Sequence, residues 1–258
     1  MDYPAFLRYL AGDFARLREV ARDNLTNRVP SCPEWTVYDL VDHVAVVYLQ
    51  KVECMRLGHR PQSWPPEFGD EPVLERLDRG FAALMVEFGT RDAGSPGGTW
   101  YEPDPTVGFW ARRMAHETLI HRIDAELAAG AGAAPIPAEL ALDGIDEVLE
   151  CFLRYGSRAW REDFVADLPT VPAPPVLIAS GDRGWLVRAA PEGVLVEPGS
   201  PVAPGSGRAA ARIEGGPADV LRWLWRRDPL GTAPATVGIS GDTGLVEQLR
   251  GLLYDATQ

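Results

Sequence analysis

The sequence predicts a helical N-terminal domain followed by a small α+β domain, and three observations predict it. Apolar residues recur at spacings of three and four through the first two-thirds of the 258 residues, which is the periodicity of helices that bury one face. A proline-rich stretch, "REDFVADLPTVPAPP", then interrupts the pattern. Short runs rich in valine and isoleucine, separated by glycine-rich turns, follow it and are typical of strands.

Five helices are expected before the proline-rich stretch. The second begins near Thr36, because Thr36 and Asp39 form a variant of the capping box at the start of an apolar stripe. A glycine- and proline-rich loop at 89–105 separates the third helix from the fourth. The helices are expected at about 3–25, from 36, at 72–88, at 107–129 and at 138–160.

The C-terminal part is expected to alternate strands with two helices. Its strand candidates are 176–180, 185–189, 193–197, 209–214 and 235–239, and its helix candidates are 217–227 and 243–254. We therefore expect three segments: a helical bundle at 1–162, a linker at 163–175 and an α+β domain at 176–258.

The composition excludes several classes of function. The formal net charge is −12, from 25 basic and 37 acidic residues, which argues against an electrostatic binder of nucleic acid or of an anionic membrane. The three cysteines are too few and too far apart for a disulfide framework and fit a reducing compartment. No segment reaches 18 uninterrupted apolar residues, so we expect a cytoplasmic protein without a signal peptide or membrane span.

The segment "MAHETLIHRIDAE" (114–126) carries the most informative motif. It resembles the zinc-protease pattern His-Glu-x-x-His but contains one more residue between the histidines. Residues four apart on a helix share a face, whereas residues five apart do not. Glu117 and His121 can therefore bind one metal ion, while His116 and His121 cannot easily do so, and the zinc-protease reading fails.

A third ligand has to come from another helix. His43 lies beside the apolar stripe of the second helix, and in an antiparallel bundle it can face Glu117 and His121. Two imidazoles and one carboxylate leave an open coordination position, as in catalytic zinc sites. The alternatives are a surface pair of Glu117 and His121 and a polar His43 at the core edge. Asp124 either orients His121 or forms a surface ion pair with a neighbouring arginine.

The motifs "CPEWTVYDLVDHVA" and "WARRMAHETLIHRIDAE", in this order and about seventy residues apart, resemble the mycothiol-dependent maleylpyruvate isomerase family. The resemblance covers roughly 1–160 and implies a DinB-like four-helix bundle, with an additional helix, whose metal ligands fall on His43, Glu117 and His121. The rest is similar to that family's sterol-carrier-type C-terminal domain. There the resemblance implies an arginine that contacts the carboxylate of the substrate, at Arg226 or Arg227. A cation that stabilises the C-terminus of a helix is the alternative for both.

The resemblance implies an enzyme that holds a divalent metal, zinc before others, and takes mycothiol as cosubstrate. The thiol would add to a small electrophilic substrate, giving either isomerisation or thiol transfer. Two alternatives stay open, a metal-dependent hydrolase and a non-catalytic protein that binds a small ligand. The partners expected are therefore a low-molecular-weight thiol and a small electrophile, and neither nucleic acid nor membrane.

Overall fold

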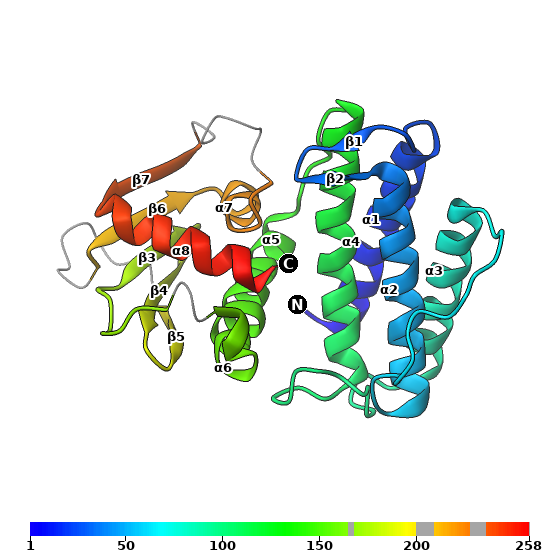
Figure 1. Ribbon diagram of the computed structural model, residues 1–258, viewed down its shortest axis with the longest axis horizontal. Helices are drawn as coiled ribbons and strands as arrows, with labels where there is room; N and C mark the ends of the chain where they lie inside the picture. The colour runs from blue at the N-terminus through cyan, green and yellow to red at the C-terminus, as the bar shows by residue number, and fades with distance from the viewer. Residues whose placement is uncertain (165–167, 200–208, 228–235, 258) are drawn as a thin grey trace. The chain divides into compact units, whose positions relative to one another are not determined.

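The computed structural model describes residues 1–164, 168–199, 209–227 and 236–257. These residues divide into two compact units, Met1–Pro135 and Ile136–Gln258. The first unit is helical and the second combines a sheet with helices (Figure 1). The fold class expected from the sequence is confirmed.

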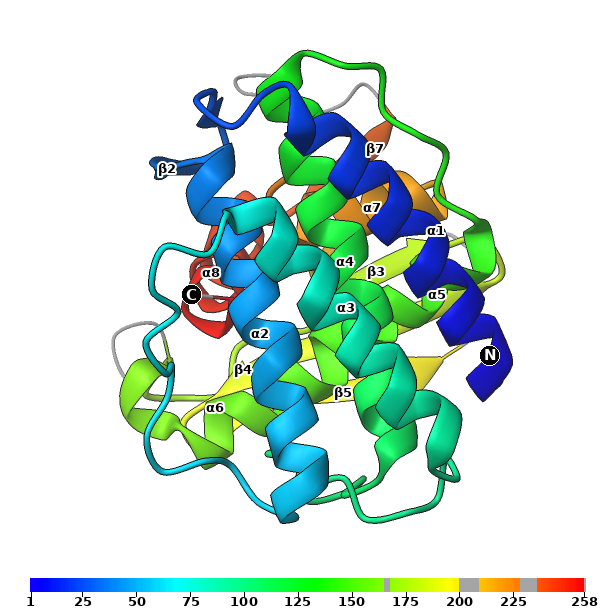
Figure 2. The same ribbon diagram turned by 90° about the vertical axis from the view of Figure 1, so that its right-hand side faces the viewer.

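Four long helices, which lie side by side, build the first unit (Figure 1). Helix α1 packs against α4, and α2 packs against both α3 and α4; Figure 2 shows α3 beside α2. They span α1 (Tyr3–Arg22), α2 (Val37–Leu57), α3 (Val73–Thr90) and α4 (Val107–Ala129). Two short strands, β1 (Arg28–Val29) and β2 (Cys32–Thr36), form an antiparallel pair between α1 and α2. The sequence analysis did not anticipate this pair.

Local sequence signals set the ends of these helices. Thr36 is the N-cap of α2, and its side chain and that of Asp39 complete the expected capping box. Thr106 caps α4 at its start through a hydrogen bond from the Phe109 amide, and Gly130 ends α4 in the left-handed conformation with a φ of 61°. The helix α4 therefore spans the residues that the sequence predicts.

The second unit contains a mixed five-stranded sheet in the order β5-β4-β3-β6-β7. Strand β3 pairs in parallel with β6, and the other neighbours are antiparallel. All five residues of β3 are buried, as expected for a central strand that is covered on both faces. The strands are β3 (Val176–Ser180), β4 (Arg183–Ala190), β5 (Gly193–Gly199), β6 (Ala211–Gly215) and β7 (Val237–Gly241).

The helices of this unit begin with the predicted fifth helix. It is continuous but not uniform, because a π-helical segment, η1, follows α5. Helix α7 is shorter than expected and ends before Arg226. The helices are α5 (Ala138–Glu147), η1 (Val148–Tyr155), α6 (Gly156–Ala159), η2 (Arg161–Phe164), α7 (Pro217–Leu224) and α8 (Thr243–Ala256).

The boundary between the units differs from the expected one at 162. Asp146 of α5 accepts hydrogen bonds from Arg183 and from the Trp185 indole of β4, and Ser157 accepts one from the Val194 amide of β5. These contacts tie 138–159 to the sheet, so the boundary falls at Pro135. The expected linker at 163–175 belongs to the second unit, where the Ala173 amide donates to the Ala189 carbonyl. Residues 165–167 of that linker lie outside the described residues.

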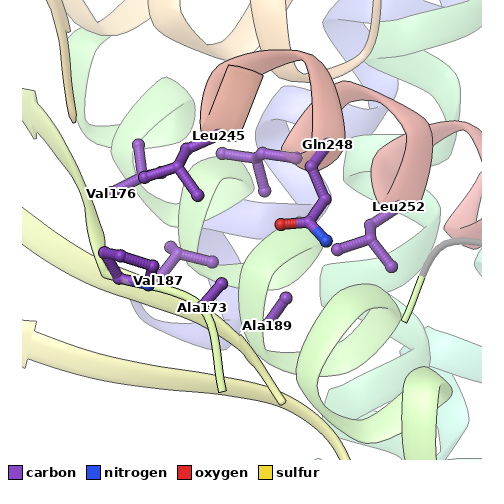
Figure 3. A pocket seen from close by; sticks show the side chains of 9 residues that line it. Ala173, Val176, Val187, Ala189, Leu245, Gln248 and Leu252 are labelled. Atoms are coloured by element: carbon purple, nitrogen blue, oxygen red, sulfur yellow. The ribbon is translucent and has the colours of Figure 1, made fainter. Parts of the chain in front are cut away.

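A small apolar hollow lies between α8 and the sheet (Figure 3). Leu245, Leu249 and Leu252 of α8 face Val176 and Val187 across it. Gln248 is the only side chain with a polar end group among those that line it. Among the described residues, no helix is both long enough and apolar enough to cross a membrane.

Candidate metal centre

Helix α2 brings His43 to the site from one side. The capping box at Thr36 fixes the start of α2, and His43 follows about two turns later. Its ring lies 5.0 Å from the ring of Trp35, the last residue but one of β2. The His43 side chain is 37% exposed, so this edge of the site is open to solvent.

Helix α4 brings Glu117 and His121 from the other side. The two residues are four apart and lie on one face, as the helical geometry requires. Nε2 of His121 lies 3.2 Å from Oε1 of Glu117. Both side chains are more buried than His43, with 14% and 10% of their surface exposed.

The two histidines converge on a single carboxylate oxygen. Nε2 of His43 also lies 3.2 Å from Oε1 of Glu117, and the two imidazole rings meet edge to face at 5.0 Å. One ligand atom from each of the three residues lies within 4.8 Å of the other two. The residues that the sequence analysis selected on two separate helices thus form one cluster.

Charges around Glu117 keep it ionised. Burial acts to raise the pKa of this carboxyl, but Arg113 and His121 outweigh burial and hold the pKa well below its usual range. Arg113 donates a hydrogen bond to Oε2, the oxygen that faces away from the histidines. Oε1 therefore stays directed at the two imidazoles.

A buried carboxylate orients His121. Asp124 is fully buried, and its Oδ2 lies 3.1 Å from Nδ1 of His121. Its other oxygen accepts a hydrogen bond from Ser31, in the turn between β1 and β2. Burial acts to lower the pKa of His121, but Glu117 and Asp124 raise it to about 9. A carboxylate behind an imidazole is the arrangement that fixes a metal-binding histidine.

The two remaining histidines lie away from the cluster. His116 is buried and contacts the ring of Phe6 on α1 at 6.1 Å, so it points to another face of α4. His59 lies in the exposed loop after α2, with Nδ1 3.0 Å from the Arg60 carbonyl oxygen. The position of His116 agrees with the helix geometry that excluded a zinc-protease site.

Comparisons with known proteins agree with this architecture. Residues 7–126 match the Mycothiol maleylpyruvate isomerase N-terminal domain, and residues 139–248 match the MDMPI C-terminal domain. The chain belongs to the mycothiol-dependent maleylpyruvate isomerase family. The division between the two matched regions falls on the same side of α5 as the division between the compact units.

Solved structures in this family share the fold. The crystal structure of the mycothiol-dependent maleylpyruvate isomerase aligns with a TM-score of 0.59 at 15% identity, covering 94% of this chain and 95% of that chain. A histidine-to-alanine mutant of the isomerase aligns with a TM-score of 0.60 at 13% identity and the same coverage. No curated protein matches the chain significantly in sequence.

The two arginines that the family resemblance selects lie in the second unit, just after α7. Arg226 adopts a φ of 55°, and its guanidinium lies 4.3 Å from the centroid of the Tyr254 ring. Arg227 is buried and donates to the Trp225 carbonyl oxygen at 2.8 Å. Asp228 and Pro229, which follow them, lie outside the described residues.

Several residues around the site were not singled out by the sequence analysis. Ser31 contacts Asp124 only because the unpredicted β1–β2 pair folds over α4. The sequence pattern offered an arginine only as a surface partner for Asp124, whereas Arg113 is buried and donates to Glu117. The spacing of four between Arg113 and Glu117 was the signal that could have found this pair.

Proposed function

We propose that this family member is an enzyme that holds a divalent cation, zinc before others, on His43, Glu117 and His121 and uses mycothiol as cosubstrate. The observation that carries the proposal is the convergence of two imidazole nitrogens on one carboxylate oxygen, each at 3.2 Å. Family membership and the solved isomerase structures with the same fold support the choice of thiol.

The residues fit such a cation. Two histidines and one glutamate are the donor set of several catalytic zinc sites, which keep a fourth position for water or substrate. Asp124 supports the fit because it occupies Nδ1 of His121 and leaves Nε2 for the cation. The same donors accept other divalent ions, because imidazole suits iron, nickel and copper as well as zinc.

The surrounding residues have distinct roles in this proposal. Arg113 balances the charge of Glu117 and holds its second oxygen away from the cation. The exposed edge of His43, beside Trp35, provides the approach for the thiol and the electrophile. A bound cation lowers the pKa of a coordinated thiol, so that thiolate, the competent nucleophile, is available at neutral pH.

The thiolate then attacks an electrophilic double bond of a small substrate. Addition forms a C–S bond and moves the electron pair of the double bond onto the conjugated carbonyl as an enolate. The resulting single bond rotates, and return of the electron pair expels the thiolate and restores the double bond in the other geometry. If the adduct is protonated and released instead, the product is a thioether. Isomerase and transferase thus share the first step, and no cysteine of the chain has to act as nucleophile. Cys54 and Cys151 are buried accordingly.

In the second unit we propose Arg226, in preference to Arg227, as the residue that contacts a substrate carboxylate, because it is the less buried of the two. The buried guanidinium of Arg227 donates to the carbonyl oxygen of Trp225, the C-cap of α7, in a position that suits a structural cation. Replacing Arg227 by alanine should then lower the thermal midpoint. Replacing Arg226 should lower the midpoint less than replacing Arg227 does, and it should raise KM for an acidic substrate.

The decisive experiment measures metal content and thiol dependence together. Protein purified without a histidine tag is analysed by plasma mass spectrometry, beside a Glu117→Ala/His121→Ala variant. We expect about one zinc or similar ion per chain in the unaltered protein and almost none in the variant. Isomerisation or thioether formation from maleylpyruvate, followed by proton NMR, should require both the ion and mycothiol.

Other outcomes would contradict the proposal in recognisable ways. Hydrolysis of an ester or amide at a rate that does not depend on added thiol would identify a metal hydrolase instead. Protein that takes up no ion after equilibration with zinc, yet binds a small ligand, would be a non-catalytic binding protein.

A further inference from the structure

Lys51 is the only lysine of a chain that carries 25 basic residues, so the other 24 (25 − 1) are arginines. It lies on α2, eight residues after His43, which is a rise of about 12 Å along the helix. His43, Val47 and Lys51 follow at spacings of four and lie along one side of α2. This side of α2 faces α4 at both ends, as the contacts of His43 and Lys51 show.

The ammonium group of Lys51 has an unusual environment. It lies 4.9 Å from the centroid of the Trp110 ring on α4 and donates to the Gln50 amide oxygen at 2.6 Å. Within the part of the chain that the structure describes, no carboxylate forms an ion pair with it at 4.0 Å or less. A half-buried ammonium is thus held by one neutral acceptor and one aromatic face.

The Lys51 side chain lies along the contact between α2 and α4 that also carries the metal cluster. His43 contacts Glu117, and Lys51 contacts Trp110, which lies seven residues before Glu117 on α4. Helices α2 and α4 therefore run antiparallel where they pack together, and this line of contact is the seam between them. Side chains on a helix lean toward its N-terminus, which for Lys51 is the His43 end. Glu117 is the carboxylate whose charge acts most strongly on the ammonium; Arg113, Arg60 and the Cys54 thiol are further electrostatic neighbours.

The opposite end of the seam is closed by backbone. The Trp110 indole donates to the Gly97 carbonyl oxygen at 2.7 Å. A Cβ on Gly98 would lie 2.5 Å from the Cys54 carbonyl oxygen, so the loop before α4 presses directly on the end of α2. Both contacts lie at the end of α2 opposite the metal cluster.

The charge balance around Lys51 favours an anion. Burial lowers the pKa of Lys51 to about 8, Glu117 partly opposes this, and Arg113 and Arg60 lower it further. A buried charge is stable only when a counter-charge or hydrogen bonds replace its hydration. A carboxylate that entered beside the ammonium would supply that counter-charge.

We propose that Lys51, backed by Trp110 and flanked by Arg113, binds a carboxylate of the electrophilic substrate and thereby selects acidic electrophiles. This inference rests on the proposed function, because it places the electrophile beside the cluster formed by His43, Glu117 and His121. Lys51 is a specificity residue: it orients the substrate and takes no part in thiol activation.

The single lysine allows a direct test that does not depend on turnover. Protein labelled with ¹³C-lysine gives one Cε signal, and maleate, a small dicarboxylate, is titrated into the metal-free protein. We expect the signal to shift in a saturable manner and the pKa of the amine to rise by about one unit, because a bound carboxylate favours the charged form. Dimethyl maleate, which lacks the charge, should leave both unchanged. A signal that ignores maleate would overturn the proposal.

Kinetics of the metal-loaded enzyme provide the second test. Lys51→Met keeps the aliphatic stem on Trp110 and removes the charge, and Lys51→Arg restores a cation. Lys51→Met should raise KM for an acidic electrophile roughly 10- to 100-fold, with partial recovery in Lys51→Arg. The KM for mycothiol should not change.

The control is Arg8→Met, which removes an exposed cation that also lies over an aromatic ring, Tyr9, at 5.2 Å. It should change neither KM. Equal KM values for acidic and esterified electrophiles in the unaltered enzyme would contradict a selective role for Lys51.

The two proposals fail separately. If the protein takes up no metal but still shows the maleate-dependent shift, the anion site at Lys51 is supported and the metal-dependent chemistry is rejected. If turnover depends on the thiol but the Lys51 signal does not respond to maleate, the proposed chemistry is supported and the anion site is rejected.

Discussion

The fully buried carboxylate of Asp124 lies 3.1 Å from Nδ1 of His121. This contact decides which nitrogen of the imidazole is directed at Glu117, because only Nε2 remains for the cluster. Asp124 therefore acts on the proposed metal affinity through His121.

Asp124→Ala should weaken zinc binding about 10- to 100-fold, because the ring loses the partner that fixes its tautomer and orientation. Competition with a chelator of known affinity measures the change. Asp23→Ala serves as the control, since that carboxylate is exposed and pairs with Arg22 on the surface. Equal zinc affinity in Asp124→Ala and the unaltered protein would exclude an orienting role.

His43→Ala should abolish stoichiometric metal binding with little loss of stability, because the His43 side chain is 37% exposed and its removal leaves no large cavity. His59→Ala removes an exposed loop histidine outside the cluster and should bind metal normally. Plasma mass spectrometry and thermal unfolding of the two variants separate ligand loss from unfolding. Full metal occupancy in His43→Ala would assign the third ligand elsewhere.

Asp13 should make the stability of the first unit fall as the pH rises from about 4 to 6. Burial raises the pKa of Asp13 from 3.8 to about 6, against the attraction of Arg122. The folded state thus binds more protons than the unfolded state in this range, and the stability present below pH 4 is lost as the pH passes 6. At about 1.4 kcal/mol per pKa unit, the loss approaches ~3 kcal/mol.

Asp13→Asn should remove this loss, so its free energy of unfolding relative to the unaltered protein should improve between pH 4 and 7. Urea unfolding at a series of pH values measures the trend. Asp23→Asn is the matched control: hydrogen bonds from Arg22 lower the pKa of Asp23, so this substitution should show a small trend of opposite sign. Parallel pH profiles for Asp13→Asn and the unaltered protein would contradict the assignment.

Gly98→Ala should destabilise the first unit by more than about 2 kcal/mol. Gly98 has a φ of 63°, and its added Cβ would meet backbone atoms of α2 and of the loop that follows it, at 2.5 to 2.7 Å. Gly130, with a φ of 61°, has no atom within 4 Å of the same added Cβ. Gly130→Ala should therefore cost only the left-handed backbone strain, about 1 kcal/mol. Urea unfolding compares the stability of the two variants. Equal losses of stability would show that the loop around Gly98 moves to accommodate the added Cβ.

The sequence by itself determined the four long helices of the first unit and the three residues of the cluster. The capping box at Thr36 and Asp39 fixed the start of α2, and the interval of four between Glu117 and His121 placed both on one face of α4. These are local effects, set by hydrogen bonds and helical geometry within a few residues. The third member, His43, could be predicted because an antiparallel bundle brings one face of α2 against one face of α4.

Only the tertiary structure decided the features that depend on contacts distant in sequence. The helix at 138–159 looks like a bundle helix by its periodicity, but its hydrogen bonds to β4 and β5 assign it to the second unit. Ser31 meets Asp124 across 93 positions of the chain. The sequence shows only that Lys51 is the single lysine, whereas the structure shows that its ammonium lies over the ring of Trp110. Periodicity tells which face of a helix is buried, whereas the identity of what it is buried against comes only from packing in three dimensions.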